Sequence, residues 1–102
     1  MNPPSLTITD FQKYIHDRYY QTDHTRGTPA TFMWFIEEVG ELATALHKSA
    51  GQGAQTTGND NLDEEFADVF AWLCTLANIN HVNLGDAVHR KYLTASGPRG
   101  HK

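Results

Sequence analysis

Four segments of this chain carry apolar residues at helical spacing, and each opens with residues typical of a helix N-terminus. No segment shows the alternation of apolar and polar residues that marks a half-buried strand. The pattern therefore predicts an all-α fold of four helices, with the second and third antiparallel. The helices are expected over residues 8–20, 28–48, 61–80 and 83–93, with connecting loops over 21–27 and 49–60.

The two central helices carry the clearest apolar stripes. The stripe of the earlier helix covers about 100° of the helical wheel, the width expected of a helix that is buried on one side. The stripes predict the core of the protein. They consist of Phe32, Phe35, Ile36, Val39, Ala43 and Leu46 in the earlier helix, and of Leu62, Phe66, Val69, Leu73, Leu76 and Ala77 in the later one.

Size and composition narrow the class of protein. A chain of 102 residues suits one small domain with a modest core, expected over residues 1–95 with a flexible tail over 96–102, and oligomerisation would help such a core. The formal charge of −4, without a cluster of lysine or arginine, argues against nucleic-acid binding. The single cysteine excludes an intramolecular disulfide framework, and the absence of a CxxC pair argues against structural zinc.

The expected location is the cytoplasm. Nothing at the start of the chain resembles a signal peptide, and no apolar run approaches the length of a membrane span. A lone cysteine fits a reducing compartment. We therefore expect a soluble protein without a membrane partner.

Two acidic clusters stand within the central helices. They are Glu37-Glu38-Val39-Gly40-Glu41 and Glu64-Glu65-Phe66-Ala67-Asp68. On the helical wheel Glu38 and Glu41 share a stripe of about 80° with Trp34, Ala45 and Lys48, away from the apolar stripe. Glu65 and Asp68 lie together with Trp72, whereas Glu64 lies about 100° further round toward solvent.

Antiparallel helices would bring these two acid pairs into one cleft. Four carboxylates at one point repel each other, and a hard cation relieves that repulsion, so the pattern predicts Mg²⁺, with Mn²⁺ as a substitute. The predicted ligands are Glu38, Glu41, Glu65 and Asp68. The alternative is a solvated acidic face, where most such helical pairs lie. The two tryptophans would sit at the same end of the cleft, as stacking platforms for a bound ring or as core or interface aromatics.

The sequence from about Thr7 to Tyr92 resembles the MazG family of all-α nucleotide pyrophosphohydrolases. The resemblance is carried by the two E-x-x-E/D pairs together with the flanking Trp34-Phe35-Ile36-Glu37 and Val69-Phe70-Ala71-Trp72-Leu73. It implies hydrolysis of a nucleoside triphosphate to the monophosphate and diphosphate, on four carboxylate ligands of magnesium, in a homodimer or homotetramer. It also implies a base pocket near the first loop and the aromatic end of the cleft.

The match departs from the family pattern in two places, and it also differs from a related group that acts on phosphoribosyl-ATP. The asparagine and arginine common after the last-helix lysine are missing, so phosphate binding there depends on Lys91 alone. The cysteine-bearing tail of some relatives is also missing. Trp72 and Leu73 stand where a related phosphoribosyl-ATP group has histidine, which argues against that substrate.

Further candidate roles belong to residues around the acids. Glu37 or an unliganded carboxylate oxygen is a candidate general base, although Glu37 points away from the ligand stripe on the wheel. Lys48 and Lys91 are candidate phosphate contacts, with a helix-dipole role as the alternative. His24 is a candidate base contact or a solvated loop residue.

Two functions follow from these observations. The first is a magnesium-dependent (d)NTP pyrophosphohydrolase, with nucleotide-pool cleansing as its role. The alternative is a catalytically inactive helical module that senses nucleotides or binds another protein. Retention of all four ligand positions favours the enzyme. The preferred base and sugar depend on a pocket assembled by the fold.

Overall fold

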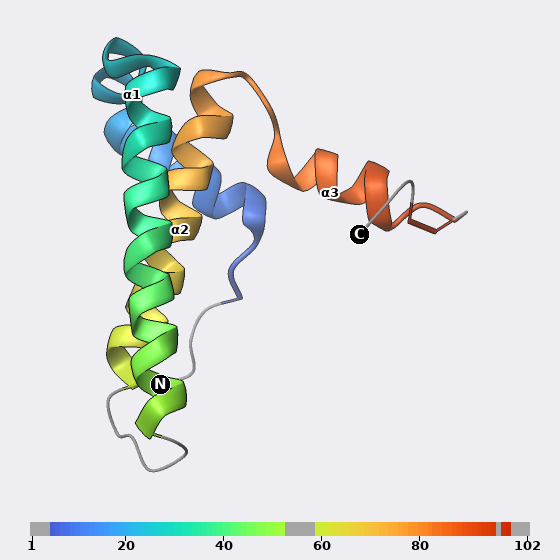
Figure 1. The fold of residues 1–102 in the computed structure, drawn as a ribbon. Coiled ribbons are helices and arrows are strands. Elements are labelled where there is room, and N and C mark those ends of the chain that lie inside the picture. The colour runs from blue at the N-terminus through green and yellow to red at the C-terminus, as the bar shows by residue number, and fades with distance from the viewer. Residues whose placement is uncertain (1–4, 53–58, 96, 99–102) are drawn as a thin grey trace.

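The computed structural model describes residues 5–52, 59–95 and 97–98, and these form three helical elements. They are α1 (Ile8–Gln52), α2 (Asn59–Ile79) and α3 (Leu84–Tyr92), and the described residues contain no strand. The predicted all-α class is therefore confirmed. The second half of α1 and α2 run side by side and antiparallel (Figure 1). Most of the expected tail lies outside the described residues, so that domain boundary stays a prediction.

The element α1 consists of two helical segments that meet at Gly27. This glycine has φ 83° and ψ 169°, a backbone conformation that residues with a Cβ rarely adopt, and Pro29 stands in the next turn. The predicted loop over 21–27 is wrong, because residues 21–26 are helical and the break is confined to one residue. The first two of the four expected helices therefore form one element, α1, and the structure has three elements.

The second segment of α1 packs against α2 along a seam. Buried and half-buried side chains recur in both helices at alternating spacings of three and four residues, the pattern of closely packed helices. The residues with this spacing are Thr31, Phe35, Glu38, Leu42, Ala45 and Ser49 in α1, and Leu62, Glu65, Val69, Trp72, Leu76 and Ile79 in α2, whereas the buried residues of α2 are Cys74, Thr75, Ala77 and Asn78. Two half-buried glutamates, Glu38 and Glu65, therefore occupy positions of the seam.

The predicted core stripes are wrong for much of their length. Phe32 is 50% exposed and Phe66 is 53% exposed, and Ile36, Val39, Leu46 and Leu73 are also exposed. The reason is the rotation of α1 about its own axis. A neighbouring stripe of α1 faces α2 in the seam, so the largest apolar side chains of α1 face outward. A continuous apolar stripe on a surface is typical of a protein–protein interface.

A buried glutamine joins the first segment of α1 to the turn between α2 and α3. The Gln12 amide donates to Asn78 Oδ1 at 2.9 Å and to the Val82 carbonyl at 2.7 Å, and its oxygen accepts from the Leu84 N–H at 2.9 Å. Gly85 approaches the same segment so closely that an added Cβ would lie 2.6 Å from Thr9 Oγ1. The start of α3 is thereby fixed.

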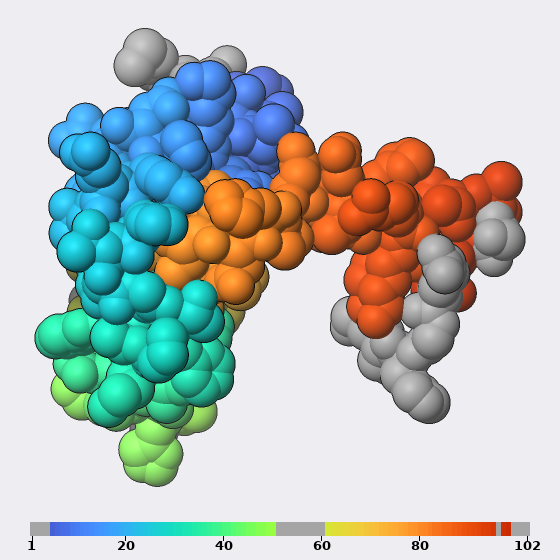
Figure 2. Space-filling model, turned by 90° about the horizontal axis from the view of Figure 1, so that it is seen from above, coloured from blue at the N-terminus to red at the C-terminus, as the bar shows by residue number. Residues whose placement is uncertain are grey.

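The remainder of α3 stands apart from the rest of the protomer. It extends away from the α1–α2 pair (Figures 1 and 2), and none of its residues is buried. Among the helices described here, none is both long and apolar enough to cross a bilayer.

Candidate functional site

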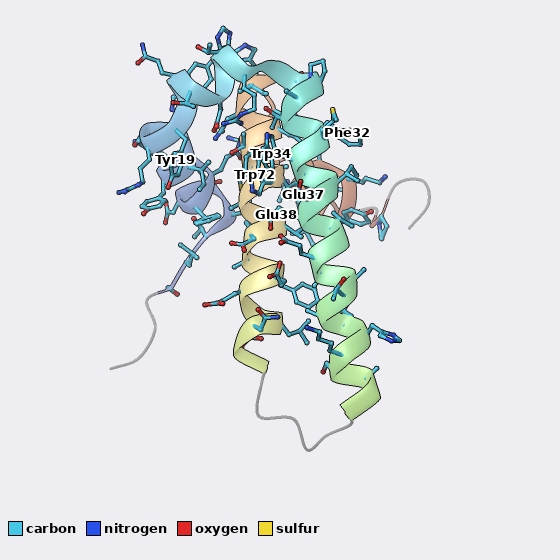
Figure 3. All side chains as sticks on the ribbon, turned by 60° about the vertical axis from the view of Figure 1, so that its left-hand side comes forward. Tyr19, Phe32, Trp34, Glu37, Glu38 and Trp72 are labelled. Carbon is cyan, nitrogen blue, oxygen red and sulfur yellow. The ribbon has the colours of Figure 1, made fainter. Side chains whose placement is uncertain are left out.

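Three carboxylates meet across the seam. One oxygen each of Glu38 on α1 and of Glu65 and Asp68 on α2 lies within 4.8 Å of the other two. Figure 3 shows Glu38 in the space between the two helices. Oxygens that bind one Mg²⁺ at about 2.1 Å are at most about 4.2 Å apart, so a small closure gives a shared site.

Two of these carboxylates bury an oxygen that has no hydrogen-bond partner. The atoms are Oε2 of Glu38 and Oε2 of Glu65. An unpaired carboxylate oxygen in a seam position costs free energy unless a proton or a cation is bound to it. All three residues offer hard oxygen ligands, so the donor set fits a divalent cation such as Mg²⁺ or Mn²⁺.

The electrostatics of the cluster favour loss of negative charge. The pKa of Glu38 is raised to about 7, chiefly by desolvation, then by the charge of Glu41 and a hydrogen bond to it, and then by the charges of Asp68 and Glu65. The pKa of Glu65 is also raised, first by desolvation and then by the charges of Glu41, Asp68 and Glu64. A bound cation would relieve the repulsion that produces these shifts.

The other two predicted catalytic carboxylates lie outside the group of three. Glu41 is exposed, but it lies near enough to raise the pKa of both Glu38 and Glu65. Glu37 is also exposed. Their roles as metal ligand and general base stay predictions.

The two tryptophans lie together at one end of the acidic cluster, as the two motifs predict. Their rings are stacked, with centroids 6.3 Å apart and planes 16° from parallel, and they lie beside Glu38 in Figure 3. The guanidinium carbon of Arg26 lies 5.1 Å from the centroid of the Trp72 ring. Trp72 therefore already has two ring contacts, and base stacking on either tryptophan stays a prediction.

A cavity of about 360 Å³ adjoins Trp72. Its lining combines Ile15, Tyr19 and Trp72 with the polar side chains of Asp23, Arg26 and Thr75. Asp23 is only 4% exposed, and its carboxylate accepts from Arg26 Nη1 at 3.1 Å and from the Thr75 hydroxyl at 3.1 Å.

Asp23 and Arg26 were not predicted as site residues, because the polar composition of residues 21–27 predicts a loop there. Had the helix been continued to Arg26, the i, i+3 spacing of Asp23 and Arg26 would have indicated an ion pair. Thr75 carries no such local signal.

The predicted basic contacts lie away from the carboxylates. Lys91 is exposed on α3 with its Nζ 5.6 Å from the Tyr92 ring centroid, and Lys48 lies ten residues beyond Glu38, about 15 Å along the helix. His24 is in the helix rather than a loop, with its ring stacked on Tyr20 at 5.4 Å. In the described parts of the chain neither lysine contacts the three carboxylates, and the roles of all three residues stay predictions.

The family match covers the acidic cluster. The family model described as the MazG nucleotide pyrophosphohydrolase domain matches residues 27–93, about two-thirds of the chain. The chain belongs to the MazG family. No curated protein matches the chain at a significant level.

The matched region begins at the kink of this MazG protein. It contains the second segment of α1, all of α2 and all of α3, and therefore Glu38, Glu65 and Asp68. The first segment lies outside it, including Asp23 and Arg26. The family therefore indicates a nucleotide pyrophosphohydrolase around the carboxylates, while the cavity is built in part by a segment that the match does not reach.

Proposed function

We propose that this MazG protein is a magnesium-dependent pyrophosphohydrolase that converts a (d)NTP and water to the (d)NMP and diphosphate. The observation that carries the proposal is the pair of seam glutamates whose buried Oε2 atoms lack a partner and lie beside Asp68. A structural role does not explain two half-buried acids with unpaired buried oxygens in the seam, because apolar residues would pack there at lower cost.

In this proposal Glu38, Glu65 and Asp68 hold the cation, and Glu41 adds a fourth carboxylate at the edge. A divalent ion held there would neutralise phosphate charge and lower the pKa of a bound water. Without a cation the acidic wall repels a triphosphate, so the carboxylates couple substrate binding to metal binding. The bond between the α- and β-phosphates breaks, the water oxygen adds to phosphorus, and the water proton passes to a carboxylate oxygen that holds no metal, with Glu37 as the other candidate base.

The proposal includes a homodimer or homotetramer. The outward stripe of α1, with Phe32, Ile36, Val39 and Leu46, is more apolar than the seam that packs inside the protomer. A second copy packed on this stripe would remove it from water. Nucleotide-pool cleansing in the cytoplasm is the role that fits such an activity.

A matched pair of variants tests the site. Glu65→Gln should abolish release of diphosphate from a panel of ribo- and deoxyribonucleoside triphosphates in Mg²⁺ or Mn²⁺, because it removes a charged ligand from the cluster. Glu64→Gln, one residue earlier on the exposed side of α2, should retain activity. Loss of activity in the Glu64 variant with retention in the Glu65 variant would contradict the proposed ligand set.

The alternative, an inactive nucleotide-sensing or protein-binding module, is favoured by one observation. Within the described residues no lysine or arginine contacts the carboxylates, so phosphate countercharge would depend on the cation. The same panel separates the two functions. A folded protein that turns over no triphosphate with either metal supports the module.

A further inference from the structure

A second cavity lies where the first segment of α1 meets the turn between α2 and α3 (Figure 2). It has a volume of about 340 Å³, and its lining includes the basic side chains Lys13, His16 and His81. We propose that this cavity, called the junction cavity below, binds a phosphate-class oxyanion such as inorganic phosphate or diphosphate. The proposed hydrolysis uses none of its residues, so the two proposals stand or fall separately.

The junction cavity is separate from the sites described above. Asn78, which lines it, lies ten residues after Asp68 on α2, about 15 Å along the helix. That separation exceeds the screening length of about 8 Å at physiological ionic strength, so the acidic cluster repels an anion here only weakly. In the described part of the chain, the junction cavity shares no lining residue with the cavity beside Trp72.

The amide side chains of the junction cavity leave N–H donors for a ligand. The side-chain oxygens of Gln12, Asn78 and Asn83 each accept a hydrogen bond from within the protein. Asn78 donates one of its two side-chain N–H groups to the Gln12 carbonyl. Among the described residues, the side-chain N–H groups of Asn83 have no acceptor. An oxyanion suits such a lining, because its oxygens accept strong hydrogen bonds from N–H groups.

The basic side chains add further donors. Lys13 Nζ donates to Asp17 Oδ2 at 2.6 Å, and His16 Nδ1 lies 3.4 Å from Asp17 Oδ1. These contacts leave two N–H groups of the ammonium and the Nε2 atom of the imidazole for a ligand. Asp17 itself does not line the cavity, and no other carboxylate of the described residues does.

Two helix N-termini meet beside the junction cavity. Thr9 stands in the first turn of α1 and Gly85 in the first turn of α3, and an added Cβ on Gly85 would lie 2.6 Å from Thr9 Oγ1. Helix N-termini carry partial positive charge, which favours an anion. The helix α2 ends here as well, but the carbonyls of Ala77 and Asn78 in its last turn accept from N–H groups of the turn.

His81 occupies a backbone position where a histidine lowers stability. Its φ is 59°, and it follows α2 in a turn closed by the Val82 N–H, which donates to the Ala77 carbonyl at 2.8 Å. Glycine is the usual residue at such a helix end, because a Cβ is strained there. Stability therefore does not explain a histidine at this position, whereas contact of its side chain with a ligand in the cavity does.

Anion titration of the metal-free protein tests the proposal. Without a divalent cation the acidic cluster repels anions, so binding reports on the junction cavity. After removal of divalent ions with a chelating resin, calorimetry should give a Kd of about 1 mM or lower for diphosphate, for phosphate or for both. Tighter binding of diphosphate assigns the site to the product of the proposed hydrolysis, and tighter binding of phosphate assigns it to the free ion.

Two variants and one control locate the bound anion. His81→Gly removes an imidazole and Lys13→Gln removes an ammonium, so each should weaken binding by about tenfold or more through loss of a charge-assisted hydrogen bond. His89→Asn changes an exposed histidine of α3 outside the cavity lining and should bind as the wild type does. Equal binding by the wild type and both cavity variants overturns the proposal, as does a Kd above about 10 mM for both anions.

The stability of His81→Gly separates a ligand contact from a structural role. Relief of the left-handed strain should raise the Tm of the anion-free protein by roughly 4–8 °C. Diphosphate or phosphate, whichever binds more tightly, should raise the Tm of the wild type more than that of the variant. A glycine variant that is less stable than the wild type would show that His81 serves the turn, and would overturn the proposal.

Discussion

Replacing Glu38 by glutamine should stabilise the metal-free protein above neutral pH. The pKa of this carboxyl is raised from an ordinary value of 4.5 to about 7, first by desolvation and then by Glu41. The ionised form therefore opposes folding, and glutamine keeps the shape of the side chain without the charge. If Glu38 served only to stabilise the fold, its replacement by glutamine would lower the stability of the protein.

The magnitude follows from the pKa. The difference between 4.5 and about 7 corresponds to at most about 3.4 kcal/mol at high pH, since each pKa unit is worth 1.36 kcal/mol. The side chain is half-buried, so solvent screening lowers the expected gain to about 1–2 kcal/mol. For a domain of this size that gain raises Tm by roughly 5–10 °C.

The pH dependence has a defined sign. Below about pH 4.5 the carboxyl is protonated in both folded and unfolded states, so Glu38→Gln changes little. As the pH rises through 4.5 to 7 the unfolded state ionises first, and the wild-type protein loses stability relative to the variant. The gain should therefore be full at pH 8 and small at pH 4.

Thermal unfolding followed by circular dichroism measures this effect. Glu37→Gln, an exposed neighbour on the same helix, is the control and should shift Tm little at either pH. Saturating Mg²⁺ should raise the Tm of the wild type and not that of the Glu38 variant, which should also be inactive. A Glu38 variant that is less stable than the wild type at pH 8 without metal would refute the reasoning.

Three further predictions concern the surface and core. Ile36→Asp on the outward apolar stripe should convert the oligomer to folded monomers in analytical ultracentrifugation, and a monomeric wild type would contradict the interface. Gly85→Ala should cost about 1–3 kcal/mol in urea unfolding, because its Cβ would meet Thr9 Oγ1, and adding Thr9→Ala should restore most of the loss. Cys74 is fully buried, and burial raises the pKa of its thiol to about 11. Mass spectrometry should therefore detect alkylation of Cys74 only after unfolding. Rapid labelling of the native protein would contradict this prediction.

Local signals predicted the helices well because they act within one turn. Thr7 Oγ1 accepts from the Asp10 N–H at 3.0 Å, and Asn83 Oδ1 accepts from the Asp86 N–H at 2.9 Å, so both residues cap the start of a helix. The extent of the break near Gly27 was not predictable in this way. The polar composition of residues 21–27 is equally compatible with a loop and with a helix. The structure has a helix there, and the hydrogen bond from the Thr75 hydroxyl to Asp23 links it to α2.

The acidic site was predicted in part for the same reason. The i, i+3 spacing puts Glu65 and Asp68 on one side of α2, and that requires only helix geometry. The rotation of α1 against α2 decides which acid of α1 joins Glu65 and Asp68. It places Glu38 among the three carboxylates and Glu41 at their edge. Side-chain spacing within one helix carries no information about that rotation.

The sequence by itself determined that this chain is helical and which carboxylates lie on common faces, because both follow from contacts between residues three or four apart. Tertiary structure decided which stripe of α1 is buried within the protomer. α1 has two usable stripes, one apolar and one containing Glu38, and the choice depends on the surface of α2 and on any second copy. It also decided that Asp23 and Thr75, far apart along the chain, form one polar wall, since only packing brings such residues together.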